Sequence, residues 1–414
     1  MVQESQQINA YDRQILRALA ACVAQHAASP EQERKRKLWT ANNDLKTGEP
    51  VVFIDPENGW GEILPPSALL CKGDLARSWE MELRKRLFHA EQLKDDVVID
   101  ATFAVPHVSR DDGWGLPVIR EGGSNGGAYH IKAAIEDYEE NFDQVHFPNL
   151  TVDQEASDRL LSLAQETFDG LLDVEQYTQW WWSLGLTWWY IDLRGLENFL
   201  CDFLLEPEWV HRMMNLLCDG AMKRIDWLEA NGLLFSNNGN RYVGSGGFGF
   251  TEDLPALRRG VSPKAMWGFV ESQETSSVSP DMYGEFIYPY HEKLASRFGL
   301  NCYGCCEAFE GRWKYVSHLP NLRRVSCSPW SKRDLAAELL SSRYIASHKL
   351  SPTPLASANM DEDVVRHHLR EVLDHAKGTV PELIMKDNHT LGGNPNNAIR
   401  WVELARDEIS KSKL

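Results

Sequence analysis

The amino-acid sequence predicts an α/β fold, namely an eight-stranded parallel β/α barrel with an N-terminal helical extension. In the second half of the chain, short extended runs alternate with helical segments, which is typical of parallel strands joined by crossover helices. Six such runs lie near residues 242, 267, 301, 323, 344 and 383. Two earlier runs, 96–103 and 183–191, bring the number to eight, and eight units favour a closed barrel over an open sheet.

The segment before the first of these runs is expected to be helical. Residues 11–27 and 75–93 place apolar side chains at the spacing of an amphipathic helix. We therefore divide the chain into a helical extension, residues 1–95, and a catalytic barrel domain, residues 96–414. Between the first two strands the sequence is polar and rich in glycine, which predicts a lid-like insertion around residues 108–180 over one mouth of the barrel.

The helices of the second half have recognisable ends. Residues 208–232 form a long amphipathic pattern that stops at Gly232. Ser279 and Asn394 each precede a proline. Proline after such a residue marks a helix start, because its missing N–H group is not needed in the first turn. These boundaries locate the loops that follow the predicted strands.

Composition argues against several classes of function. The 414-residue chain is 43% apolar, enough for a large core, but no stretch reaches the ~20 apolar residues of a membrane-spanning helix. Its formal net charge of −17 repels phosphate backbones and anionic lipids, so binding to nucleic acid or membranes is not expected. The N-terminus lacks the basic and apolar blocks of a signal peptide, which predicts a cytoplasmic protein whose eight cysteines stay reduced.

One glycine-rich motif is not expected to bind a nucleotide. Residues 244–249, GSGGFG, satisfy the dinucleotide-binding pattern G-x-G-x-x-G after an extended run. A helix must start there for its N-terminus to face a pyrophosphate, whereas Asp253 and Pro255 interrupt the residues that follow. We expect instead a strand end that lets a bulky ligand approach the backbone.

Titratable side chains gather where the predicted strands end, which is where barrel enzymes bind their substrates. Those ends carry Glu271, Tyr303, Cys305, Glu307, Cys327, His348, Lys349, Lys386, Asp387 and His389. Thiolate, imidazole and carboxylate are ligands that zinc takes. The two-residue period of a strand places Cys305 and Glu307 on one face, whereas the neighbouring Cys302 and Cys306 are expected to be packing residues.

Aromatic residues give a further indication. Five of the fifteen tryptophans lie in the run WWWSLGLTWWY, residues 180–190. The run predicts either core packing or an aromatic wall around an apolar or aromatic ligand. Under the second alternative Trp188 and Trp189 bind the substrate, and we assign Trp267 and Tyr303 to the same role.

Four longer phrases carry a resemblance to a known family. They are MWGFVESQETSSVSPDMYGEF, FGLNCYGCCEAF, LPNLRRVSCSPWSKRD and MKDNHTLGGNP. The chain resembles the uroporphyrinogen decarboxylase superfamily, most closely its corrinoid-dependent methyltransferases. This resemblance implies a β/α barrel and one of two activities, porphyrinogen decarboxylation or methyl transfer. The arginine-rich N-terminal motif of the porphyrinogen decarboxylases, R-Q-A-G-R, is missing, which favours methyl transfer.

The resemblance also implies a site and its partners. The methyltransferase relatives bind zinc through an H-x-C motif at the fifth strand, and here that position reads Tyr303-Gly304-Cys305. The implied zinc ligands are Cys305 and His389, with Glu307 or Glu271 in place of the missing histidine, and we assign Glu307 to this role. Glu271, His348 and Asp387 are candidate proton donors.

The expected activity is an O-demethylase type of methyl transfer. A methyl group would pass from a methoxylated, aromatic donor or a methylated amine to the cobalt of a separate corrinoid protein, because the chain has no recognisable cobalamin-binding segment. Two alternatives are a decarboxylase of another substrate and a catalytically silent subunit that binds the corrinoid protein.

Overall fold

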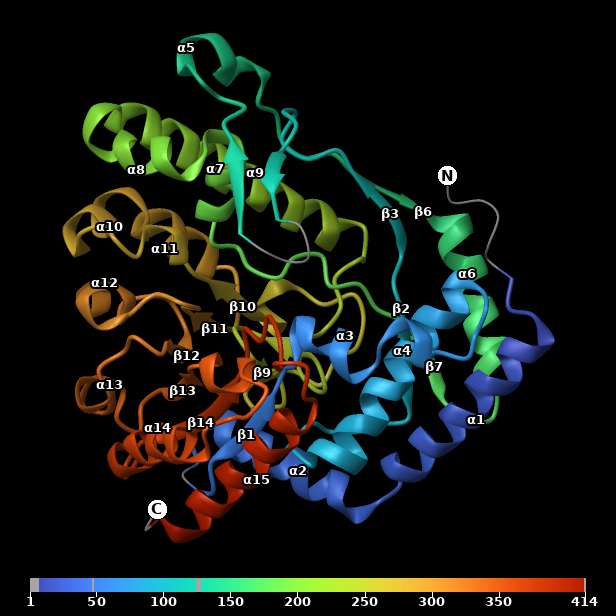
Figure 1. Cartoon of the computed structure of the whole chain (residues 1–414). Helices are drawn as coiled ribbons and strands as arrows, with labels where there is room; N and C mark the ends of the chain where they lie inside the picture. Colours follow the sequence, from blue (N-terminus) through green and yellow to red (C-terminus); the bar gives the residue numbers. More distant parts are fainter. Residues whose placement is uncertain (1–6, 47, 124–127, 413–414) are drawn as a thin grey trace.

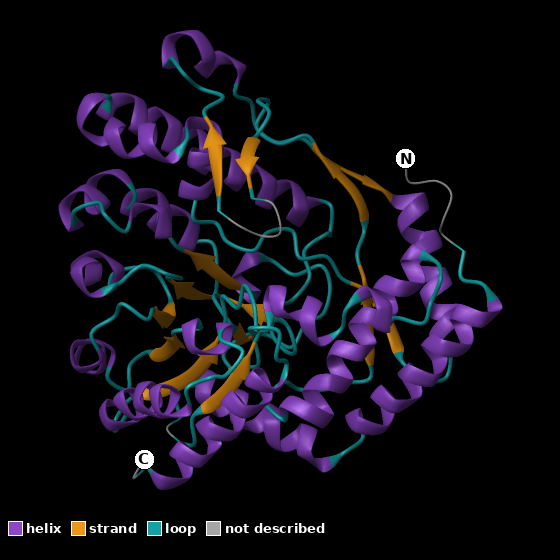
Figure 2. Cartoon of the chain, in the orientation of Figure 1, coloured by secondary structure: helices purple, strands orange, loops and turns teal. Residues whose placement is uncertain are grey.

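A six-stranded parallel sheet forms the centre of the protein (Figures 1 and 2). This computed structural model describes residues 7–46, 48–123 and 128–412. The sheet has the order β1 (Val51–Ile54), β14 (Val380–Met385), β13 (Ile345–Leu350), β12 (Leu322–Cys327), β11 (Leu300–Tyr303) and β10 (Trp267–Val270). Each pair of neighbours is parallel, so the predicted architecture of parallel strands and crossover helices is confirmed.

Two further strands form a separate parallel pair, β2 (Thr102–Val105) with β7 (Asp173–Gln176). In the described part of the chain, no ladder joins this pair to the six-stranded sheet, and hydrogen bonding therefore does not close a ring. The observed fold is a mixed α/β structure in which, among the described residues, the β2–β7 pair is hydrogen-bonded to neither edge strand of the six-stranded sheet, β1 or β10.

Three strand predictions are corrected by the structure. The segment 1–95, expected to be helical, contributes β1, because its run of four buried residues between two helices pairs with β14. The run 183–191 is not a strand but leads into helix α7 (Thr187–Arg194), and the strand lies earlier, in β7. The run near residue 242 gives only β8 (Tyr242–Val243), which forms an antiparallel hairpin with β9 (Gly247–Phe248).

Helices surround the sheet, and most of them cover its outer side (Figure 2). They are α1 (Ala10–Ala27), α2 (Pro30–Asn43), α3 (Trp60–Ile63), α4 (Asp74–Phe88), α5 (Tyr138–Asn141), α6 (Gln154–Phe168), α7, α8 (Leu196–Leu205), α9 (Pro207–Ala230), α10 (Pro280–Phe286), α11 (Tyr288–Ala295), α12 (Trp313–Val316), α13 (Arg333–Leu340), α14 (Glu362–His375) and α15 (Asn396–Lys411). None of the helices in the described residues combines the length and apolar character that a membrane crossing requires.

The two faces of the sheet have different neighbours. Alternate residues such as Val325 and Ala346 enter the hydrophobic core that the sheet forms with the helices, which defines the outer face. The opposite, inner face is covered by the β8–β9 hairpin. A Cβ atom on Gly247 would lie 2.5 Å from Cζ of Arg324, and one on Gly244 would lie 2.9 Å from Sγ of Cys302. The glycine-rich motif therefore lets the hairpin backbone lie directly on the inner face.

The predicted lid region contains two antiparallel ribbons at one end of the molecule (Figure 1), together with α5, α6 and β7. β3 (Val108–Asp111) pairs with β6 (Leu150–Asp153), and β4 (Ile119–Gly122) pairs with β5 (Tyr129–Lys132). The β4–β5 ribbon contacts α7 through the ion pair between Arg120 and Asp192, whose Nη2 and Oδ1 atoms lie 2.6 Å apart. Whether this region covers the site stays a prediction.

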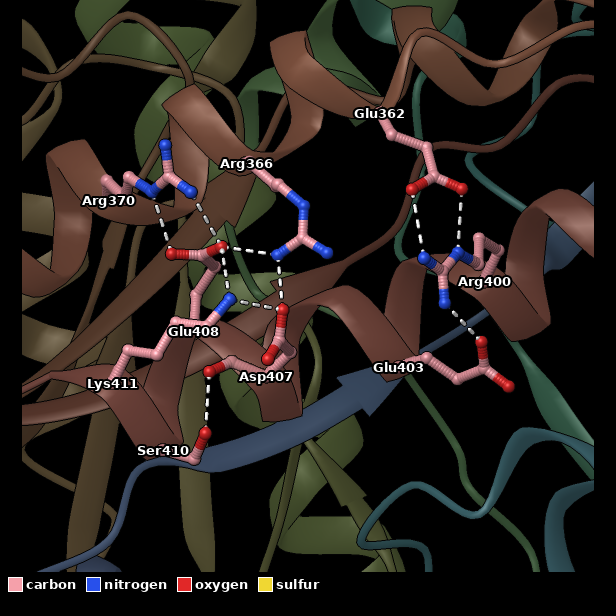
Figure 3. A network of polar contacts seen from close by, with 9 residues as sticks. All are labelled: Glu362, Arg366, Arg370, Arg400, Glu403, Asp407, Glu408, Ser410 and Lys411. Carbon is pink, nitrogen blue, oxygen red and sulfur yellow. Dashed lines mark hydrogen bonds and ion pairs between the residues drawn. The ribbon is translucent and has the colours of Figure 1, made fainter.

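Helices α14 and α15 are joined by a dense network of ion pairs (Figure 3). Arg370 Nε lies 2.7 Å from Oε2 of Glu408, which also pairs with Arg366. Further along, Arg400 Nε lies 2.7 Å from Oε1 of Glu362. The network holds one face of α14 against α15. His368, Glu371 and His375 of α14 take no part in the contacts drawn in Figure 3.

Candidate active site

Two adjacent thiols follow β11 at its carboxyl end, on the inner side of the sheet. Cys305 Sγ accepts a hydrogen bond from Oγ of Ser245, in the hairpin, at 3.3 Å. The Sγ atoms of Cys305 and Cys306 are 3.7 Å apart, and Cys306 Sγ lies 4.0 Å from Oδ2 of Asp387. Cys305 is buried, whereas Cys306 is half-buried. Cys306 is therefore the more accessible thiol.

Lys386, at the end of β14, provides a positive charge beside these thiols. Its Nζ lies 3.1 Å from Oδ1 of Asp387 and 3.6 Å from Oε1 of Glu57. Burial opposes the ammonium charge, but the surrounding Cys305, Asp387 and Glu57 together raise the pKa of Lys386 above its usual range. The ammonium also lies 5.9 Å from the ring centroid of Trp182. Lys386 is thus a permanent cation near neutral pH.

A second amine occupies the same face one strand away. Lys349 donates to Oγ of Ser347 at 2.7 Å, and burial lowers the pKa of its ammonium group to about 8. Its charge is therefore more easily lost than that of Lys386, which has carboxylate partners.

Both carboxylates that contact Lys386 come from strained backbone positions. Asp387 has φ 60° and Glu57 has φ 47°, values in the left-handed region that side chains other than glycine rarely adopt. Asn388 Nδ2 donates to the carbonyl of Asp55 at 2.7 Å and so ties the loop after β14 to the loop after β1. Strained residues of this kind cluster at functional sites, because the surrounding structure must hold them there.

A buried carboxyl group follows β10. Glu271 Oε1 accepts from Ser183 Oγ at 3.0 Å, and Oε2 accepts from the N–H group of Gln273 at 3.2 Å. Complete burial, together with the nearby carboxylates of Glu274 and Glu307, raises the pKa of Glu271 well above its usual range. A raised pKa keeps the proton on a carboxyl group to higher pH, which favours a role as proton donor.

The predicted zinc ligands do not converge. Both carboxylate oxygens of Glu307 accept backbone N–H groups, Oε1 from Ser272 at 2.9 Å and Oε2 from Cys305 at 2.9 Å. His389 lies at the rim, with Nδ1 3.4 Å from Nδ2 of Asn58. In residues 7–46, 48–123 and 128–412, no three His, Cys, Asp or Glu side chains are grouped as metal ligands. The set Cys305, Glu307 and His389 thus does not fit a zinc ion.

Two other predicted residues point away from the thiols. The side chains of His348 and Tyr303 lie on the outer face of the sheet. His348 Nδ1 lies 3.5 Å from Nη1 of Arg333, on α13. Tyr303 belongs to the hydrophobic core that the sheet forms with the helices. Burial lowers the pKa of His348 well below its usual range. Trp267 lies deeper on the inner face, where its Nε1 donates to the carbonyl of Gly249 at 3.0 Å.

The tryptophan run divides between core and site. Trp189 is buried in the main hydrophobic core, where its ring lies 5.2 Å from that of Trp114, and Trp188 packs against the same core. Trp182 is 41% exposed and lies against Lys386. The structure therefore brings Trp182, rather than Trp188 or Trp189, to the charged cluster.

A cleft of about 670 Å³ lies between β1 and the β2–β7 pair. Seven aromatic residues contribute to its lining, Phe53, Trp60, Trp79, Phe103, Tyr177, Tyr242 and Phe248, beside polar and charged side chains. Asp55 also lines the cleft, and the charge of Lys386 acts on the pKa of Tyr242, another lining residue. This space therefore adjoins the charged cluster. Sequence reasoning missed these residues. The signal was VVFIDPE, a buried run followed by Asp-Pro, within the segment taken to be helical.

The chain matches no protein-family model and no curated protein. Among solved structures, its fold is similar to that of a methyltransferase from Methanosarcina mazei, with a TM-score of 0.50 and 11% sequence identity. The similarity covers 91% of this chain and 99% of that one. At this identity the likeness shows a shared fold.

Proposed function

We propose that the chain is a methyltransferase that takes a methyl group from a methoxylated, aromatic donor or a methylated amine. The acceptor would be the cobalt of a corrinoid held by a separate protein. The observation that carries the proposal is the cluster of Cys305, Cys306, Lys386 and Asp387 beside an aromatic cleft at the carboxyl edge of a parallel sheet. The fold shared with the Methanosarcina mazei methyltransferase supports it.

Ether or amine cleavage needs a stabilised leaving group, because phenoxide, alkoxide and amide leave poorly. The ammonium of Lys386 supplies positive charge in a buried place, where charge stabilises a transition state more than in water. Glu271, whose pKa is raised well above its usual range by burial, is the candidate donor to the departing heteroatom. The zinc ion implied by the resemblance has no role in this proposal, because its expected ligands do not fit.

The donor would lie in the aromatic cleft. Its rings offer stacking surfaces, and Asp55 and Tyr242 mark the end that adjoins the charged cluster. Trp182 covers Lys386 from the other side. The reduced corrinoid, brought by its own protein, would supply the cobalt nucleophile.

The test is methyl transfer to a supplied corrinoid. The protein is mixed with a reduced corrinoid protein and a panel of methoxyarenes and methylamines, and methyl-cobalt formation is followed by absorbance. We expect turnover with at least one donor, a loss of at least about a hundredfold in Lys386→Met, and no change in the exposed control Lys264→Met. Turnover without a corrinoid, or full activity of Lys386→Met, would contradict the proposal.

A second candidate is decarboxylation of a carboxylated aromatic substrate. The cleft is also lined by Lys85, Arg86 and Arg241, whose positive charges would attract a carboxylate. Release of CO₂ from an aromatic acid, with no methyl transfer from any donor, would favour this candidate over the first.

A further inference from the structure

A second cavity, of about 450 Å³, lies on the outer side of the sheet, between the loop after β12 and helix α14. Its lining includes Ser331, Lys332 and Arg333 from the start of α13 and His368, Glu371 and His375 from α14. The α14 residues are three, four and seven positions apart, so they share one helix face. This cavity is separate from the aromatic cleft and shares no residue with it.

Arg333 lines this cavity without a direct ion-pair partner among the described residues. Its guanidinium contacts only neutral acceptors: the carbonyls of Cys327, Ser328 and Lys349, at 3.2 to 3.5 Å, and Nδ1 of His348 at 3.5 Å. Within the described residues, no carboxylate lies within ion-pair distance of it. Burial lowers the pKa of Arg333, which shows that its charge is poorly solvated. The charges of Glu371 and Glu310 act on Arg333 from a distance but neither carboxylate pairs with it, so a bound anion would supply a direct counter-charge.

The N-terminus of α13 adds unpaired donors at the same place. Its first backbone hydrogen bond runs from Ala336 to the carbonyl of Lys332, so the N–H groups of residues 333–335 have no acceptor within the helix. Lys332, at the N-cap position, provides no side-chain cap. Ser331 is only 7% exposed, and its buried hydroxyl has no hydrogen-bond partner among the described residues. Helix N-termini of this kind attract oxyanions.

We propose that this cavity binds the phosphate group of a small phosphate monoester. The phosphate would contact Arg333, Ser331 and the start of α13, where the donors converge. The cavity is much larger than a phosphate ion, and its far side, on α14, carries the imidazoles of His368 and His375 and the carboxylate of Glu371, while Asp334 lies beside Arg333. Those groups suit a hydroxylated organic part, and they disfavour a purely anionic ligand.

Titration calorimetry with the whole protein tests this proposal. The probes are inorganic phosphate, glycerol 3-phosphate, ribose 5-phosphate and, as the matched neutral compounds, glycerol and ribose. We expect saturable binding of at least one monoester, tighter than that of inorganic phosphate, and no binding of the neutral compounds. Absence of saturable binding for both monoesters, or equal binding of the neutral compounds, would overturn it.

Variants locate the bound phosphate. Arg333→Gln should weaken monoester binding at least tenfold, whereas Arg343→Gln, at an exposed arginine that also contacts only neutral acceptors, should leave it unchanged. His368→Ala tests the other wall and is expected to weaken binding by a smaller factor, even if Arg333→Gln fails to fold. Wild-type affinity in both Arg333→Gln and His368→Ala would place the ligand elsewhere and overturn the assignment.

Discussion

Strand β14 carries two charged groups on its inner face, and the two have opposite character. Glu382, near its start, is fully buried and pairs with Arg324, their Oε1 and Nη2 atoms 2.9 Å apart. Lys386, just past its end, pairs with Glu57 and Asp387, whose side chains are 32% and 40% exposed. The first pair is sealed beneath the hairpin, whereas the second opens to solvent on strained loops. We therefore expect the buried pair of Glu382 and Arg324 to stabilise the fold, whereas the pairs of Lys386 belong to the site proposed above.

The largest effect is expected at the sealed pair. Arg324→Met leaves the carboxylate of Glu382 buried without its cation, which should lower the free energy of unfolding by about 3–5 kcal/mol. Denaturant unfolding measures the loss. The double variant Arg324→Met/Glu382→Leu removes both charges and should recover most of it. A loss below about 1 kcal/mol in the single variant would show that the pair is not buried as described.

The raised pKa of Glu271 should make the stability of the protein depend on pH. The pKa of Glu271 is raised in the folded state, so its contribution to stability is complete below about pH 4.5 and is lost as the pH rises toward the folded-state value. Glu271→Gln keeps an acceptor for Ser183 and cannot ionise. Its melting temperature relative to wild type should therefore increase from pH 4.5 to pH 8. Parallel pH profiles of the two proteins would contradict the raised pKa.

Relief of backbone strain should sharpen the contrast further. Asp387→Gly removes a left-handed non-glycine residue, a gain of about 1–2 kcal/mol that the greater freedom of glycine in the unfolded chain offsets by about 0.5–1 kcal/mol. Because the variant also removes the ion pair of Asp387 with Lys386, we expect no net gain in unfolding free energy, together with reduced methyl transfer. Equal losses of stability and activity would show that Asp387 serves only the fold.

The smallest effect is expected on the surface network of Figure 3. Arg400 pairs with Glu362 and Glu403, but its side chain is 41% exposed, so solvent screens the interaction. Arg400→Ala should cost no more than about 0.5 kcal/mol in urea unfolding. A cost near that of Arg324→Met would remove the distinction between sealed and open charge.

The sequence predicted the second half of the fold best. Strands β10 to β14 and the helices between them follow from local periodicity and from caps such as Ser279, which accepts from the N–H group of Met282 at 3.2 Å. β1 was missed because its four residues carry no period of their own, and only the distant β14 makes them a strand. The run 183–191 was mistaken for a strand because aromatic residues favour strands, whereas here packing against α9 and the ribbon selects a helix.

The candidate site was predicted in part. Cys305, Glu271 and Asp387 do end their strands at one edge, as the order of elements indicated. Glu57 escaped notice because its place beside Lys386 depends on the pairing of β1 with β14, which no local pattern encodes. His348 fell on the outer face because the parity of a strand is fixed by its register with its neighbours.

The pairing of β1 with β14 also constrains when the protein can assemble. Val51 is synthesised 331 residues before its partner Glu382. Until then β1 is an unpaired edge, and the cluster around Lys386 lacks half of its residues. The sheet can therefore be completed only once β14 has been made, and such long-range pairing folds slowly. A chaperone that shields the waiting edge strand would raise the yield of active protein.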